Sequence, residues 1–181
     1  MNRMTKIAIC YGSRYGTTTE IVQEMTKTAE EAGAQVEAVE IKKQKLSSAL
    51  EEYDLIIVGS GIQANRWTSG PLKFIENNLE ILSNQKVALF VVCGDAGNPD
   101  RVEIAQTDYL DAIIEKYPSL SPVSTGLFAG MFDFKRYNFV TRTIVKTIAK
   151  RRTPKGTELP EIQDFRDWDM IREWITNLVQ S

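Results

Sequence analysis

The chain contains no histidine and only two cysteines among its 181 residues. Zinc sites and many acid–base catalytic sites depend on these residue types, so we expect no metal site and no histidine-based catalysis. Cys10 and Cys93 each end an apolar run. That position is typical of buried, reduced thiols and not of a disulfide framework.

Long hydrophobic runs are missing as well. No run approaches the roughly 18 to 20 apolar residues that cross a bilayer, and residues 1–5 lack the apolar core of a signal peptide. We therefore expect a cytoplasmic protein. The composition, 43% apolar and 25% charged, is ordinary for a globular protein, and the length fits a single domain, residues 1–181.

Acidic residues are scarce in one stretch of the chain. Residues 133–156 contain eight lysines and arginines but only one acid, Asp133, although the net charge of the whole chain is −2. This asymmetry predicts a surface that meets an anionic partner.

Apolar, β-branched runs alternate with amphipathic stretches along the sequence. We expect strands at residues 6–11, 35–41, 54–59, 86–93 and 123–129, and helices near residues 18–33, 69–82, 102–114 and 167–179. The alternation predicts right-handed crossovers between parallel strands. The fold class is therefore α/β, with a five-stranded parallel sheet between two layers of helices.

Three loops follow the carboxyl ends of predicted strands, at residues 13–18, 60–69 and 94–100. Ligands of parallel sheets bind at this edge, where the strand order reverses. We expect the three loops to surround one ligand in a crevice that side chains leave open.

The loop 13–18 has the composition of a phosphate-binding turn. Gly12 and Gly16 permit a tight backbone turn, and hydroxyls follow them at the start of a helix, whose N–H groups attract anions. The pattern G-x-x-x-x-G-K-[ST] of nucleoside triphosphate sites is absent. A competing interpretation is that these hydroxyls only cap the helix.

The loop resembles the phosphate loop of the flavodoxin family, [ST]-x-T-G-x-T. Ser13, Gly16 and Thr18 match this pattern, Tyr15 replaces its first threonine, and Arg14 adds a positive charge. The resemblance implies the strand order 2-1-3-4-5 and FMN as the cofactor. It implies these cofactor-binding residues: Ser13, Arg14, Tyr15, Gly16, Thr17, Thr18, Gly61, Ile62, Gln63, Ala64, Asn65, Trp67, Cys93, Gly94, Asp95 and Gly97. Trp67 is the residue expected to stack on the flavin ring.

Two other α/β functions fit the sequence less well. Residues 59–64 match the dinucleotide pattern G-x-G-x-x-[GA], but the next helix begins only near Ser69, and Glu80, the acid at the expected distance, lies inside that helix. A signalling receiver domain needs an acceptor aspartate at the carboxyl end of the middle strand. Asp54 stands at the opposite end.

Residues 130–163 form an insertion relative to flavodoxins. The Ala129-Gly130 step, the Lys135-Arg136-Tyr137 cluster and the Asp167-Trp168 pair are similar to the menaquinone-dependent protoporphyrinogen IX oxidase family. This resemblance implies an FMN oxidoreductase of haem biosynthesis that takes hydrogen from a porphyrinogen and passes electrons to a quinone. It leaves the catalytic residues unknown. The alternative is a flavodoxin-type electron carrier with a redox partner and no substrate of its own; neither interpretation includes a nucleic acid.

The insertion itself predicts a basic amphipathic helix. Its apolar stripe contains Tyr137, Val140, Ile144 and Ile148, and cations recur every four residues at Arg142, Lys146 and Lys150. Three ligands suit such a helix: an anionic membrane surface beside residues 135–152, an acidic redox partner, or the propionates of a porphyrin. A fourth interpretation is that the stripe packs on the core and the charges are hydrated.

Overall fold

The computed structural model describes residues 4–152 and 156–181. Residues 1–3, and Lys155 of the basic stretch, lie outside this part. Five parallel strands form the middle layer, in the order β2-β1-β3-β5-β6. Their bounds are β1 Lys6–Gly12, β2 Gln35–Glu40, β3 Leu55–Gln63, β5 Val87–Cys93 and β6 Ser124–Ala129. The predicted fold class and strand order are confirmed.

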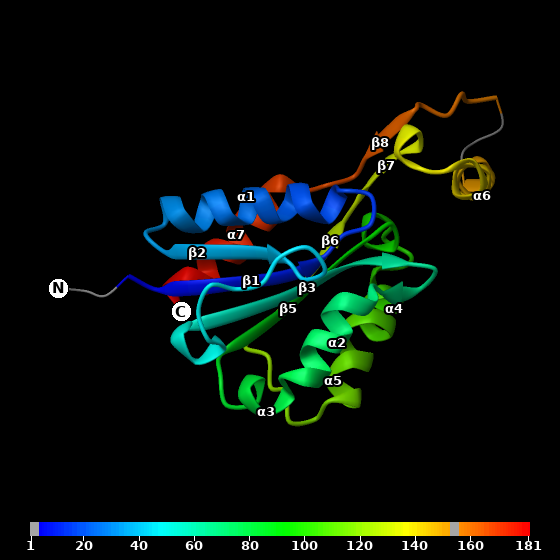
Figure 1. Cartoon of the computed structure of the whole chain (residues 1–181). Coiled ribbons are helices and arrows are strands. Elements are labelled where there is room, and N and C mark those ends of the chain that lie inside the picture. The colour runs from blue at the N-terminus through cyan, green and yellow to red at the C-terminus, as the bar shows by residue number, and fades with distance from the viewer. Residues whose placement is uncertain (1–3, 153–155) are drawn as a thin grey trace.

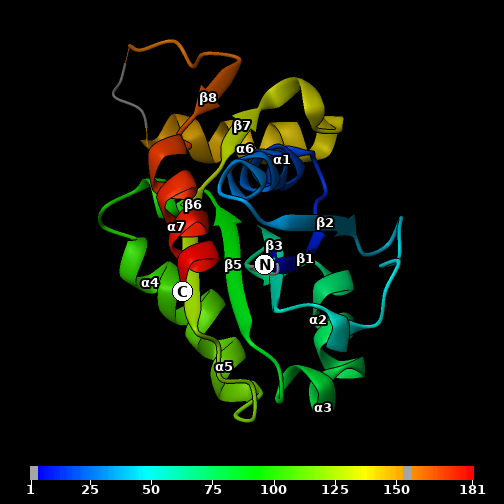
Figure 2. The same ribbon diagram turned by 90° about the vertical axis from the view of Figure 1, so that its left-hand side faces the viewer.

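Helices cover both faces of this sheet (Figures 1 and 2). One face carries α1 (Thr17–Glu31) and α7 (Trp168–Gln180); the other carries α2 (Ser69–Asn77), α3 (Leu79–Leu82), α4 (Val102–Gln106) and α5 (Ala112–Lys116). Every residue of β5 is buried, as the continuous apolar run Val87–Cys93 predicts for a strand covered on both sides. The core accordingly divides into two apolar clusters, one on each face.

The predicted loop 60–69 is wrong in most of its length. Strand β3 continues to Gln63, and the chain then returns as β4 (Arg66–Trp67), which pairs antiparallel with it. Ala64 and Asn65 connect them with φ values of 47° and 58°, the left-handed conformation of a tight two-residue hairpin turn. The pairing of Ile62 with Trp67 extends the strand beyond the point where its buried apolar run ends.

Two predicted helices are less regular than their apolar spacing suggested. The helix predicted at 69–82 breaks at Asn78, where φ is −122° and the side-chain amide donates to the carbonyl of Phe74 at 2.8 Å. The helix predicted at 102–114 is continuous, but a π-helical turn, Thr107–Asp111, joins α4 to α5. Local hydrogen bonds of this kind are not visible in an apolar repeat.

The insertion lies beyond the carboxyl ends of the strands, at one end of the domain (Figures 1 and 2). It contains β7 (Met131–Asp133), α6 (Phe139–Arg152) and β8 (Ile162–Asp164), and β7 pairs antiparallel with β8. The sequence predicted the helix but not this two-stranded sheet. Segments 131–133 and 162–164 are too short to show a strand pattern, and their pairing depends on contacts distant in sequence.

Helix α6 does not bury its apolar stripe. Val140, Ile144 and Ile148 are 66%, 55% and 46% exposed, and only Tyr137, which precedes the helix, is buried. The interpretation that the stripe packs on the core is therefore wrong for α6. A search of residues 4–152 and 156–181 found no helix with the length and hydrophobicity needed to cross a membrane.

Candidate functional site

The phosphate loop, residues 13–18, connects β1 to α1. Ser13 Oγ accepts the backbone N–H of Gly16 at 3.1 Å, and Gly16 takes a φ of 91°, which glycine adopts without steric cost. Gly16 is the N-cap of α1 and has no side chain to satisfy the first N–H groups of the helix. Those groups form the positive end of the helix dipole, which suits an anion.

The loop borders a cavity of about 90 Å³, which we call the phosphate-loop cavity. Ten of the predicted cofactor-binding residues line it: Ser13, Arg14, Tyr15, Thr17, Thr18, Gly61, Ile62, Gln63, Cys93 and Gly94. A Cβ at Gly61 would lie 2.8 Å from Thr18 Oγ1, so only glycine leaves room there. Thr18 is 3% exposed, and we find no hydrogen-bond partner for its hydroxyl in the described part of the chain.

Six further lining residues were not predicted individually: Thr68, Val92, Gly130, Met131, Phe132 and Tyr137. Four of them belong to the insertion, in which the sequence analysis named no cofactor-binding residue. The ring of Tyr137 meets that of Tyr15 edge to face, with centroids 4.6 Å apart. Burial raises the pKa of Tyr137 to about 12, so its phenol stays neutral at physiological pH.

The other six predicted residues do not line this cavity. Trp67 is buried on strand β4, its indole N–H donates to the Tyr109 carbonyl at 2.7 Å, and it lines a neighbouring cavity. Asn65 accepts the Tyr109 hydroxyl at 3.2 Å, and Asp95 pairs with Arg101 at 3.2 Å. Gly16 contributes the backbone turn, and Ala64 and Gly97 line neighbouring cavities. The cofactor contacts of all sixteen residues stay a prediction.

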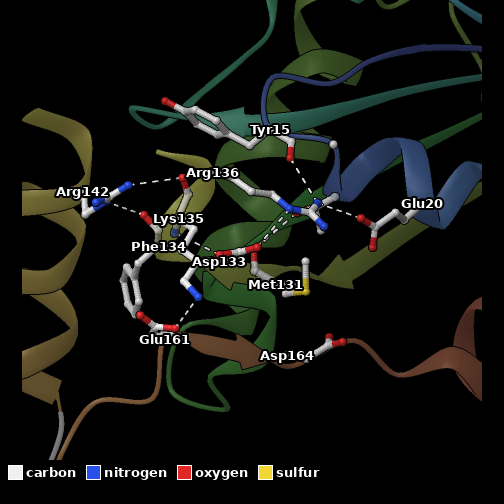
Figure 3. A network of polar contacts seen from close by, with 12 residues as sticks. Tyr15, Glu20, Met131, Asp133, Phe134, Lys135, Arg136, Arg142, Glu161 and Asp164 are labelled. Carbon is white, nitrogen blue, oxygen red and sulfur yellow. Dashed lines mark hydrogen bonds and ion pairs between the residues drawn. The ribbon is translucent and has the colours of Figure 1, made fainter. Parts of the chain in front are cut away.

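The insertion is fastened to the phosphate loop by hydrogen bonds (Figure 3). Arg136 Nη1 donates to the Tyr15 carbonyl at 3.3 Å and to Glu20 Oε1 at 2.7 Å. Arg166 Nη1 donates to Glu20 Oε2 at 2.6 Å. Burial alone would raise the pKa of Glu20, but the hydrogen bonds from Arg166 and Arg136 outweigh it and hold that pKa below its usual value.

A second, apolar cavity of about 280 Å³ lies on the insertion side, and we call it the apolar chamber. Its walls include Gly97, Val145, Ile148 and Phe165, and it shares Gly94 and Phe132 with the phosphate-loop cavity. A Cβ at Gly94 would lie 2.4 Å from Phe132 Cζ. The Phe132 ring therefore lies directly on Gly94 and separates the two cavities.

Both cysteines are free and buried, as predicted. Burial raises the pKa of Cys93 to about 11 and that of Cys10 to about 12. Cys93 therefore borders the phosphate-loop cavity as a neutral thiol and not as a nucleophile. Within the described residues, no group of three or more acidic or cysteine side chains could hold a metal ion.

The sequence profile of the flavodoxin domain matches residues 8–158. This chain belongs to the flavodoxin domain family. The match begins in β1 and runs through the phosphate loop, the sheet and α6, so it includes the residues that line the phosphate-loop cavity.

Curated relatives of this flavodoxin-family chain carry the name protoporphyrinogen IX dehydrogenase [quinone]. The protein from Leishmania major is 24% identical over 173 residues, which cover 95% of this chain and 74% of that protein. The protein from Escherichia coli strain K12 is 22% identical over 169 residues, which cover 92% and 90% of the two chains. The resemblance of this chain to the protoporphyrinogen oxidase family therefore extends over most of its length.

Solved flavodoxins share the fold. Two-electron reduced Megasphaera elsdenii flavodoxin superposes with a TM-score of 0.56 at 17% identity, covering 94% of this chain and 98% of that one. Oxidised flavodoxin 1 from Bacillus cereus gives a TM-score of 0.52 at 19% identity, covering 84% and 100%.

FMN is the cofactor of the flavodoxin family, and the phosphate end of this site fits it. The open N-terminus of α1 and the Thr18 hydroxyl offer donors to a phosphate group. The ring end is narrower than we expected from the sequence. A cavity of about 90 Å³ is small beside the roughly 300 to 1,000 Å³ of sites for drug-sized ligands, and the Phe132 ring on Gly94 is one of its walls.

Proposed function

We propose that this protein is an FMN-dependent oxidoreductase that takes hydrogen from protoporphyrinogen IX, a step of haem biosynthesis, and passes electrons to a quinone. One observation carries the proposal. Met131, Phe132 and Tyr137 of the insertion line the same cavity as the phosphate loop. A protein that only carries electrons needs a docking surface and a cofactor, whereas this chain builds an additional wall over the cofactor site.

Different residues would bind the phosphate and border the rest of the cavity. Ser13, Thr17 and Thr18, with the first N–H groups of α1, would hold the phosphate. The neutral Cys93 thiol and the neutral Tyr137 phenol border the cavity without adding charge. FMN supplies the redox chemistry: each pair of hydrogens removed from the substrate reduces one quinone to its quinol.

The apolar chamber supports a quinone as the acceptor. Phe132, Val145, Ile148 and Phe165 give it apolar walls, and the carboxamides of Asn98 and Gln163 also lie on its lining. Such walls suit a flat lipophilic ring, and carboxamide N–H groups suit its carbonyl oxygens. The curated relatives name a quinone as well.

A peripheral contact with an anionic membrane surface, by a protein of the cytoplasm, completes this proposal. Val140 and Ile144 of the apolar stripe are exposed on α6, as is Phe139 beside them, and Lys150 and Arg151 are exposed near the end of the helix. Apolar insertion and about 1 kcal/mol per cation near anionic lipid would act together. Cosedimentation with phosphatidylglycerol vesicles should be lost in Ile144→Asp, and binding that persists would exclude this contact.

The alternative is a flavodoxin-type electron carrier, which the exposed stripe of α6 also suits as a docking surface. Two measurements separate the functions. The purified protein should take up FMN on titration, with a yellow chromophore, and the holoprotein should oxidise protoporphyrinogen IX with menadione as acceptor. A protein that binds FMN and exchanges electrons with ferricyanide, but leaves the porphyrinogen unchanged, is a carrier.

A further inference from the structure

A cavity of about 670 Å³ lies on the opposite side of the phosphate loop from the insertion, and we call it the basic cavity. It is formed by the ends of β1 and β2, the β3–β4 hairpin and the start of α2. It shares Ser13, Arg14, Gln63 and Thr68 with the phosphate-loop cavity. Arg14 Nη1 donates to Gln63 Oε1 at 2.5 Å, and this hydrogen bond forms part of the wall between the two cavities.

The basic cavity combines apolar walls with positive charge. Tyr11, Ile41, Trp67 and Pro71 are among its lining residues, and so are four cations, Arg14, Lys42, Lys43 and Arg66. Its lining contains one acid, Glu40, which pairs with Lys43 at 2.9 Å. In the described part of the chain, no ion pair involves Arg14, Lys42 or Arg66, so three charges around this cavity are not compensated by carboxylates.

The start of α2 adds to the positive potential. Thr68 is the N-cap of this nine-residue helix but makes no side-chain cap, because its hydroxyl pairs with Ser60 Oγ at 2.9 Å. The first turn of α2 therefore has no side-chain cap at Ser69 and Gly70, which line the cavity. Together with the uncompensated cations, this arrangement suits carboxylate groups.

The volumes of the basic cavity and the apolar chamber differ, and this difference bears on which ligand each could bind. Sites for drug-sized ligands measure about 300 to 1,000 Å³; the basic cavity, at about 670 Å³, lies well inside that range, and the apolar chamber, at about 280 Å³, lies below it. Protoporphyrinogen IX is a large ring of four pyrroles with two propionates, whereas a quinone head has one or two rings and no charge. The larger, positively charged cavity suits the larger, anionic molecule, and the smaller, apolar chamber suits the smaller, neutral one.

We propose that the basic cavity binds the tetrapyrrole substrate, with its ring against the apolar wall beside Trp67 and its propionates on Lys42 and Arg66. The inference rests on the proposed function and gives it a substrate site. The site adjoins the cofactor cavity across the Arg14–Gln63 hydrogen bond, on the side opposite the apolar chamber. Donor and acceptor would then reach the cofactor from separate sides.

The basic helix α6 is the competing location for the propionates, but its inner cations are already engaged. Arg142 donates to the carbonyls of Phe134, Lys135 and Tyr137, at 2.6, 3.3 and 3.3 Å. Lys146 lies 5.5 Å from the centre of the Phe134 ring. Lys135, which precedes the helix, pairs with Glu161 at 2.7 Å.

The test uses the oxidised holoprotein and two probes, protoporphyrin IX and its dimethyl ester, titrated by the shift of the porphyrin absorption band. The diacid should bind at least about tenfold more tightly than the ester, because the loss of hydrogen bonds to charged groups typically weakens binding by at least that factor. The double variant Lys42→Gln, Arg66→Gln should lose this preference and keep the affinity for the ester. The matched variant Lys146→Gln, Lys150→Gln on α6 should retain the preference.

FMN affinity is measured on every variant, so that a fold defect is separated from a lost contact. Equal binding of diacid and ester by the unmodified protein would overturn the proposal. The proposal would also be overturned if the Lys42→Gln, Arg66→Gln variant still preferred the diacid, or if the Lys146→Gln, Lys150→Gln variant lost that preference. Two other results would instead count against the proposed function. One is a protein that does not bind FMN. The other is a holoprotein that prefers the diacid to the ester but does not oxidise the porphyrinogen.

Discussion

Arg136 Nη1 donates to Glu20 Oε1 at 2.7 Å, although 116 residues separate them in the sequence. The other oxygen of the same carboxylate accepts Arg166 Nη1 at 2.6 Å. Arg136 precedes α6 and Arg166 follows β8, so both flanks of that helix are held on the first turn of α1. The insertion and the phosphate loop therefore form one structural unit.

Removing the Glu20 charge should weaken FMN binding. In Glu20→Gln the side chain keeps its size but loses its ion pairs, and the insertion is held less firmly over the phosphate loop. We expect the dissociation constant for FMN to rise about fivefold, the equivalent of about 1 kcal/mol for a partly exposed pair. Titration of flavin fluorescence measures it. Glu24 lies on the same helix as Glu20 and pairs with Arg172 of α7. Glu24→Gln removes that pair, is the control and should leave FMN affinity unchanged.

Acid should release the same contact. The Arg166 hydrogen bond holds the pKa of Asp164 below its usual value, and the pKa of Glu20 is likewise lowered despite its burial. Because both folded-state values lie below the unfolded ones, the stabilisation is complete above about pH 4.5, the ordinary value for glutamate, and is lost as the pH falls through the folded values. Urea unfolding should show an advantage of the unmodified protein over Glu20→Gln that is full at pH 6 and smaller at pH 3. A difference that stays constant with pH would show that charge is not the cause.

The Thr18 hydroxyl should recognise the phosphate of FMN and nothing else of the cofactor. Thr18→Val conserves shape but removes the donor, so FMN affinity should fall about tenfold or more, as for hydrogen bonds to charged groups. Riboflavin has no phosphate, and its affinity should not change. Thr26→Val on the same helix removes a buried hydroxyl without a partner in the described structure and should alter neither affinity. An equal loss for FMN and riboflavin would assign Thr18 a structural role only.

Gly59 should be irreplaceable for packing. A Cβ there would lie 2.0 Å from two atoms of the Phe90 ring, inside the core. Gly59→Ala should lower the free energy of unfolding by about 1 to 3 kcal/mol, the usual cost of overpacking. Gly70→Ala is the control, since its Cβ would meet nothing closer than Lys42 Cγ at 3.5 Å and alanine favours helices. Equal stability of the two variants, measured in urea, would refute this account.

Trp67 and Phe132 show where sequence reasoning about the site was limited. An aromatic residue after the third strand was expected to face the cofactor, but the extra pairing in β3–β4 turns Trp67 into the core. No local sequence pattern marked Phe132 as a residue of the site. Its ring lies on Gly94 because its strand, β7, pairs with β8 outside the main sheet. In a strand, neighbouring side chains point to opposite faces, so register decides which residue meets a ligand.

The amino-acid sequence by itself determined the alternation of strands and helices, the two helical layers and the position of the phosphate loop. These features follow from apolar periodicity and from glycine and hydroxyl residues that are adjacent in the chain. Only the tertiary structure decided that the insertion closes over that loop, that α6 exposes its apolar stripe and that separate cavities lie on either side of the cofactor site. Such features depend on contacts like that of Glu20 with Arg136 and Arg166, whose partners are brought together only when the whole chain has folded.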